Sequence, residues 1–179
     1  MGWLYQKSSD FFVEDDGSYP EICICGLSKE QVIAAYKFIR EKCRFVVGKP
    51  RFFGRDQACE LELDEVECAA TMVTEGNAHP FHFMVREIRF GRDWKIPEAG
   101  VFIMHNAVAF DYEKGRLWGE LEIESLLILI LKIMKDCPDS FIRLEESVSE
   151  ENKNRFTEIV AELGREFAEL PALSAEKTG

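Results

Sequence analysis

The sequence lacks long hydrophobic segments, and this absence limits where the protein can work. Its longest apolar run spans only Leu126 to Leu131, well short of the ~20 residues that a membrane-spanning helix needs. The first residues also lack the basic segment followed by an apolar segment that marks a secretory signal peptide. We therefore expect a cytoplasmic protein that has no membrane partner.

Familiar catalytic signatures are absent as well. The chain has no glycine-rich phosphate loop ahead of a helix, no His-Glu-x-x-His and no nucleophile elbow. It contains only three histidines, and their spacing matches no standard metal signature. The sequence contains no set of motifs that identifies a protein family. We predict neither a cofactor nor a bound metal.

Basic residues are outnumbered by acidic residues. The chain has 22 Lys and Arg against 33 Asp and Glu, which gives a net charge of -11 and a pI of about 4.8. Because most of such a surface repels phosphate groups, we expect no DNA or RNA partner. The same charge attracts a basic protein over a distance that depends on the salt concentration.

Cysteine is present in an even number, but not in a pattern that indicates a bonded framework. None of the six cysteines forms a Cys-x-x-Cys pair, and a reducing compartment keeps thiols free. Cys23 and Cys25 should lie on one face of a strand, which suits packing against the core. We therefore predict six free thiols.

Length and composition favour one folded unit. A chain of 179 residues that is 46% hydrophobic can bury a core without a disulfide or a metal. We predict a single α+β domain over residues 1–170 and a loose carboxy-terminal tail over 171–179, which is polar and begins at a proline.

Three helices stand out in the pattern. The first follows Ser28, where Gln31 completes a capping box. A second helix, over about 121–135, is apolar on almost every side, so it should be largely buried against a sheet. The last helix begins after Ser149 and has an apolar stripe with an acidic outer face.

The rest of the chain predicts a mostly antiparallel sheet, because strands come in runs between the helices. The first 25 residues are interpreted as strands and turns, and 113–115 as a hairpin loop from which a strand returns. Within Phe81–Phe90 the apolar positions change phase, which a bulge near Arg86 would explain.

The acidic residues are concentrated in one stretch. From Asp56 to Ala69 there are six acids and no base. Alternation over 58–73 predicts a half-buried strand that turns near 64–65 and returns as a second strand. We expect the carboxylates on this hairpin to engage a basic partner protein, which they would also attract during encounter. The predicted partner-binding residues are Glu60, Glu62, Asp64, Glu65 and Glu67.

The first functional hypothesis is therefore a non-enzymatic protein-binding module whose acidic face engages a basic partner. In size and charge it is similar to bacterial inhibitors and immunity proteins that neutralise basic toxins, a comparison that rests on composition alone. The apolar stripe of the last helix could also support a homo-oligomer.

The alternative hypothesis is an enzyme or small-ligand-binding domain with a pocket between the sheet and the helices. Imidazole, thiol and guanidinium groups could bind or activate a substrate there. The residues predicted to form this pocket are His79, His82, His105, Cys59, Arg86 and Arg89.

Overall fold

The computed structural model describes residues 2–14, 16–91, 93–145 and 148–169. Its helices are α1 (Gly2–Phe12), α2 (Lys29–Lys42), α3 (Ala69–Thr74), α4 (Glu120–Met134) and α5 (Glu150–Glu169), with a 3-10 turn at Leu63–Glu65. Its strands are β1 (Glu21–Cys25), β2 (Cys43–Val46), β3 (Arg51–Gly54), β4 (Cys59–Glu62), β5 (Phe81–Phe90), β6 (Trp94–Ile103), β7 (Ala107–Asp111) and β8 (Phe141–Leu144).

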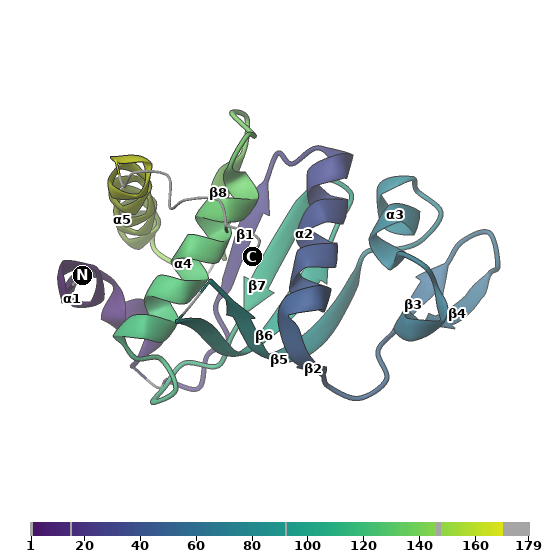
Figure 1. Ribbon diagram of the computed structural model, residues 1–179, viewed down its shortest axis with the longest axis horizontal. Coiled ribbons are helices and arrows are strands. Elements are labelled where there is room, and N and C mark those ends of the chain that lie inside the picture. Colours follow the sequence, from purple (N-terminus) through teal and green to yellow (C-terminus); the bar gives the residue numbers. More distant parts are fainter. Residues whose placement is uncertain (1, 15, 92, 146–147, 170–179) are drawn as a thin grey trace, which may run out of the picture.

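Six of the strands form one sheet in the order β2-β5-β6-β7-β1-β8, and every neighbouring pair is antiparallel. Helices α2 and α4 pack on the same side of this sheet (Figure 1). Strands β3 and β4 form a separate ribbon that projects from one end together with α3 (Figure 1). The predicted α+β class with an antiparallel sheet is confirmed, but the described ranges contain five α-helices rather than three.

Helix α4 is the buried helix that the sequence predicts. Every side chain from Leu126 to Ile130 is inaccessible to solvent or nearly so. The helix also buries a polar residue, Ser125, whose hydroxyl donates to the Leu121 carbonyl at 2.6 Å and accepts from the Lys95 amide at 2.9 Å. Because the hydroxyl is satisfied on both sides, burying it costs little, and the contact ties α4 to the start of β6.

Helix α2 begins as predicted. The Ser28 hydroxyl accepts from the Gln31 amide, and the Gln31 side chain accepts from the Ser28 amide at 2.8 Å. Val32, Ala35 and Ile39 then face the sheet at helical spacing and are buried.

The amino terminus corrects the first strand prediction. Residues 2–12 form helix α1, in which Leu4, Ser8 and Phe12 are buried at intervals of four residues. The Phe12 ring stacks on Tyr112, with centroids 4.9 Å apart, and lies 5.3 Å from Trp118. This aromatic packing stabilises a helix that is too short to be stable in isolation.

Two predicted strands are also wrong. After β4 the chain forms the 3-10 turn and then α3, so the strand expected to return through 66–70 does not exist, and β4 pairs with β3 instead. The strand expected to return from Leu117 is absent: residues 116–117 form a turn, 118–119 have no regular structure, and α4 begins at Glu120. There the Trp118 indole donates to the Glu113 carbonyl at 2.8 Å and holds the turn closed.

The phase change in β5 lies next to the predicted position but is not a bulge with an inserted residue. The register between β5 and β6 continues without a shift, from Arg86↔Glu98 to Ile88↔Ile96. Between these pairs Glu87 has a φ of 54° and lies opposite Pro97, which has no amide hydrogen to donate. Both strands change phase together, so Ile88 and Ile96 are buried in the core.

Helix α5 packs its apolar stripe into the protein's own core. Phe156, Ile159, Val160 and Leu163 are all buried, so the stripe that suggested a homo-oligomer is already covered. The predicted tail, 171–179, lies outside the described residues. Within the described part of the chain, no helix has both the length and the hydropathy needed to cross a membrane.

Replacing Phe12 tests whether α1 belongs to the core. We expect Phe12→Ala to lower the free energy of unfolding by about 3–5 kcal/mol, because the ring is fully buried. The matched control is Phe45→Ala, whose ring is 52% exposed and should cost less than about 1 kcal/mol. Chemical denaturation measures both, and equal losses would contradict this placement of α1.

Candidate binding surface

Strands β1 and β7 carry apolar residues on both faces. In β1, Ile22 and Ile24 enter the main core, whereas Cys23 and Cys25 point to the opposite side of the sheet. Antiparallel strands that meet water on one face normally alternate apolar and polar residues. A strand such as Ile22–Cys25 is instead typical of a sheet that is covered on both faces.

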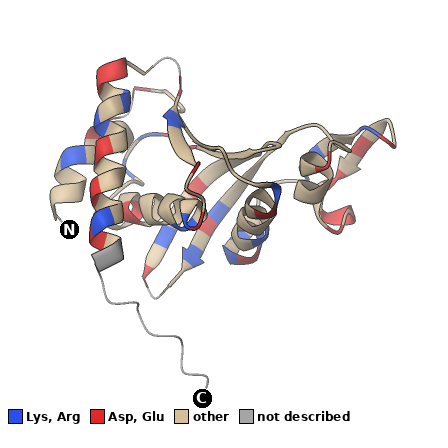
Figure 2. Ribbon diagram, turned by 90° about the horizontal axis from the view of Figure 1, so that it is seen from above, with Lys and Arg blue, Asp and Glu red and all other residues tan. Residues whose placement is uncertain are grey.

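Helices α2 and α4 lie on the same side of the sheet in both views (Figures 1 and 2). We call the other side the open face, because neither of these helices covers it. In the order of the sheet, the residues on this face are Phe45 of β2, His82, Met84 and Arg86 of β5, Glu98, Gly100 and Phe102 of β6, Asp111, Ala109 and Ala107 of β7, Glu21, Cys23 and Cys25 of β1, and Phe141 and Arg143 of β8.

Small residues lie in the middle of the open face. Cys23 pairs with Ala109 and Cys25 with Ala107 across β1 and β7, and these four residues form a second apolar cluster, separate from the main core. We call them the small-residue strip.

Larger side chains surround the small-residue strip. Phe102 and Met104 pack against it from the β6 side, and Phe141 of β8, which pairs with Cys25, is 55% exposed on the other side. The strip itself is at most 9% exposed, because short side chains lie below the level of their larger neighbours. The open face therefore has an apolar centre in which larger side chains largely cover the small-residue strip.

A histidine–aspartate pair lies at the edge of this centre. His82 Nε2 is 3.1 Å from Asp111 Oδ1, and the imidazole lies 5.0 Å from the Phe102 ring. The pair bridges β5 and β7 over Gly100 of β6. A Cβ on Gly100 would lie 1.6 Å from Asp111 Oδ1 and 2.2 Å from His82 Nε2. Only glycine leaves room for this contact.

The charges around the pair are predominantly acidic. Glu21 lies directly opposite Asp111 in the register. Partial burial, followed by the Asp111 charge, raises the pKa of Glu21, while nearby Arg143 opposes this shift. The hydrogen bond that His82 donates to Asp111 raises the pKa of His82 against the effect of burial.

A second charged pair on the open face lies nearer to β2. Arg86 Nε and Glu98 Oε2 are 2.8 Å apart, on the paired strands β5 and β6. The two groups neutralise each other, so the net charge of this part of the face is small. Among the described residues, the carboxylates of the open face that have no arginine within ion-pair distance are therefore Glu21 and Asp111, with Arg143 of β8 nearby.

The predicted acidic surface lies on the projecting ribbon and the turn that follows it (Figure 2). Its residues do not share one strand. Glu60 and Glu62 are on β4, Asp64 and Glu65 are in the 3-10 turn, and Glu67 follows that turn.

The protein's own arginines reduce the charge that this surface offers to a partner. Arg51 lies 3.4 Å from Glu60 and 3.1 Å from Glu62. Arg40 of α2 pairs with Asp64. Three of the five predicted carboxylates are thus partly neutralised within the molecule.

The six residues predicted to form a pocket are not brought together. His82 and Arg86 lie on the open face, on the side of the sheet away from α2 and α4. His79 packs against Phe53 at the base of the ribbon, with ring centroids 5.5 Å apart. The other three lie apart from one another: Cys59 is exposed on β4, His105 is exposed in the turn after β6, and Arg89 pairs with Glu87.

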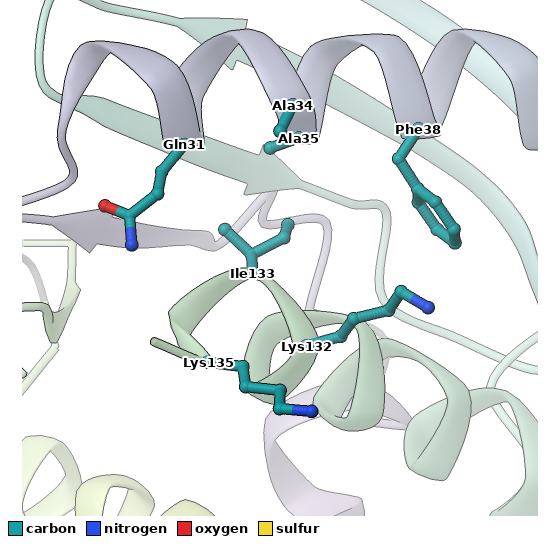
Figure 3. A pocket seen from close by; sticks show the side chains of 7 residues that line it. All are labelled: Gln31, Ala34, Ala35, Phe38, Lys132, Ile133 and Lys135. Atoms are coloured by element: carbon teal, nitrogen blue, oxygen red, sulfur yellow. The ribbon is translucent and has the colours of Figure 1, made fainter. Parts of the chain in front are cut away.

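The helical side has a shallow cavity of about 230 Å³ between α2 and α4 (Figure 3). Ala34, Ala35 and Ile133 line it, together with Lys132 and Lys135. The Lys132 ammonium is 4.7 Å from the centre of a further lining side chain, the Phe38 ring. The cavity is a gap between side chains on two packed helices and contains none of the predicted site residues.

All six cysteines are free thiols, as predicted. The Cys23 and Cys25 sulfurs are 3.3 Å apart. Burial, with the contact from Cys25, raises the pKa of Cys23 to about 12, so this thiol is a poor nucleophile at neutral pH. Within the ranges that the structure describes, no group of three or more His, Cys, Asp or Glu residues is arranged to hold a metal ion.

Comparison with known proteins found no match to a family model, to a curated protein or to a solved structure. Sequence reasoning missed two features of the open face. The double-sided apolar pattern of β1 and of Ala107–Phe110 is visible in the sequence, but it fits core packing equally well. The proximity of His82 to Asp111 depends on strand order, which the sequence does not reveal.

Gly100→Ala tests the geometry of the pair. We expect a loss of about 1–3 kcal/mol in unfolding free energy, because the added methyl group forces His82 and Asp111 apart. In an Asp111→Ala background, the same substitution should cost much less, since the closest atom is gone. Gly164→Ala on α5 is the control and should stay within about 1 kcal/mol of wild type. Equal costs of Gly100→Ala in both backgrounds would contradict the arrangement.

The His82–Asp111 contact also predicts a pH dependence. Since the folded pKa of His82 is raised, protonation stabilises the fold fully below the unfolded value of about 6.5 and loses its effect as pH rises through the folded pKa. His82→Gln should therefore cost more stability at about pH 5.5 than at about pH 8.5. An NMR titration of the imidazole should give a pKa that falls in Asp111→Asn. An unchanged pKa in that variant would argue against the hydrogen bond.

Proposed function

We propose that this protein is a non-enzymatic protein-binding module and that the open face is its binding surface. The observation that carries the proposal is the sheet itself: β1 and β7 are apolar on both sides, while α2 and α4 lie on only one. Apolar groups gathered on such a face are typical of interaction sites. A partner that packed against Phe102, Phe141 and the small-residue strip between them would complete a second buried layer.

The net charge of -11 supports a basic partner, because opposite charge speeds encounter and disfavours acidic competitors. Carboxylates of Glu21 and Asp111 place negative charge beside the apolar centre. An inhibitor or immunity-like role agrees with a small acidic module of this kind and would be one form of such binding.

The acidic surface on the ribbon is the competing location. Glu65 and Glu67 extend it beyond the three carboxylates that pair with Arg40 and Arg51. Exposed ion pairs contribute only ~0–1 kcal/mol each, so a strongly basic partner could displace these arginines. The two surfaces lie on different elements and can be altered separately.

Exposed phenylalanines give matched variants for the test. Phe45→Glu and Phe141→Glu alter the open face, and Phe53→Glu alters a similarly exposed ring on β3 outside it. We expect the first two, but not the third, to abolish cross-linking to the partner in the native host. Reversal of Glu60, Glu62 and Glu67 to Lys should leave cross-linking intact.

The opposite pattern of cross-linking would place the binding site on the ribbon instead of the open face. Loss of cross-linking in the triple Glu→Lys variant, with Phe45→Glu and Phe141→Glu unaffected, would assign binding to the ribbon. Light scattering on the purified protein reports whether the partner is a second copy. Circular dichroism checks that each variant folds, which is expected because all three rings are at least 42% exposed.

A further inference from the structure

The centre of the open face has the width of an α-helix. From β6 to β8 the sheet crosses β7 and β1, a width of about 14 Å at ~4.8 Å per strand. An α-helix with its side chains is about 10–12 Å across. Phe102 and Met104 on one side and Phe141 on the other would lie against its flanks.

Access to the floor of this centre depends on the flanking side chains. Phe102 and Met104 pack against the small-residue strip and help to keep it at most 9% exposed. Rotamer changes of interface side chains are common when proteins bind. A docking helix would turn these two side chains outward and bring its own apolar groups onto Ala109 and Cys23.

A flat sheet from a second copy fits less well. Its surface would rest on the larger side chains of Phe102 and Phe141 and would not reach the strip between them. Two copies would also bring together two surfaces that each carry Glu21 and Asp111, within proteins of net charge -11. Like charges facing each other at short range disfavour that contact.

The strip ends at a pair of carboxylates. Cys25 and Ala107 mark one end, and the pair Glu21↔Asp111 lies beyond the other, at the opposite end of β1. Asp111 accepts from His82, whereas in the ranges described the Glu21 side chain forms no hydrogen bond or ion pair. Directly opposed like charges destabilise a sheet by about 0.2–1 kcal/mol. Arg143 of β8 already acts on Glu21, and a further cation placed between the two carboxylates would remove the remaining repulsion.

We propose that the open face binds an amphipathic α-helix of another protein, whose small and apolar side chains lie on the small-residue strip and whose arginine or lysine is held between Glu21 and Asp111. The inference rests on the proposed function and specifies its partner. The distance from Cys25 to Glu21, about 13 Å at ~3.3 Å per residue, equals about nine residues of helix at 1.5 Å each. Because nine residues would turn to the opposite face of the helix, the cation should follow the apolar residue at the far end by about seven or eight residues, which is about two turns, and its long side chain spans the rest of the distance.

Synthetic helical peptides test the inference directly. One peptide carries alanine and leucine along one face and an arginine two turns further on; the second peptide has glutamine in place of that arginine. We expect the arginine peptide to bind about tenfold more tightly, with a difference that shrinks as salt is raised. Amide signals of Cys23, Gly100 and Ala109 should shift in two-dimensional NMR spectra.

The variant Glu21→Gln/Asp111→Asn should make the two peptides equal in affinity, since it removes both charges with little change in shape. Its matched control, Glu60→Gln/Glu62→Gln, removes two carboxylates from the ribbon and should preserve the tenfold difference. Shifts confined to the ribbon or to the helical side, equal affinities in the wild type, or no binding of either peptide would each overturn this inference.

Failure here is distinguishable from failure of the proposed function. If Phe45→Glu and Phe141→Glu abolish cross-linking but the peptides show no preference for arginine, the open face remains the interface and the helical, cationic partner is wrong. If those two variants leave cross-linking unchanged, the open face itself is excluded.

Discussion

The antiparallel register of β6, β7 and β1 is the constraint on which the rest of the structure depends. It places Ile22, Ile24 and Phe110 on the side of the helices and leaves Cys23 and Ala109 on the other. Because side chains alternate along a strand, a slip of one residue would exchange the two sets. The large aliphatic and aromatic groups would then lose the cover of α4, so packing holds the register firmly.

The same register assembles the charged end of the open face. Asp111 is opposite Glu21 in one direction and Gly100 in the other, and the missing side chain at Gly100 lets His82 reach across from β5. Strands β1, β5 and β7 thus each contribute one residue, Glu21, His82 and Asp111, to a small polar cluster beside an otherwise apolar centre. Its position beyond the end of the small-residue strip gives the surface a direction, which a flat apolar patch would lack.

The ribbon shows how local charge can mislead. The acidic block between Asp56 and Ala69 is real, but two of the bases that precede it along the chain, Arg40 and Arg51, pair with it. Oppositely charged blocks adjacent in sequence are close in the folded state as well as in the unfolded chain, so ion pairs between them form readily. A cluster of one sign in a sequence is therefore weak evidence for a free charged surface.

The sequence by itself determined the α+β class, the capped helix α2, the buried helix α4 and the stripe of α5, because capping, apolar content and helical spacing are local properties. It misplaced α1 and α3, whose few buried residues are stabilised by contacts with distant elements, as Phe12 is by Tyr112. Only the tertiary structure decided which face of the sheet lies away from α2 and α4 and which charges meet there. Strand order brings His82, Asp111 and Glu21 together from three separate parts of the chain, and no local pattern specifies that order.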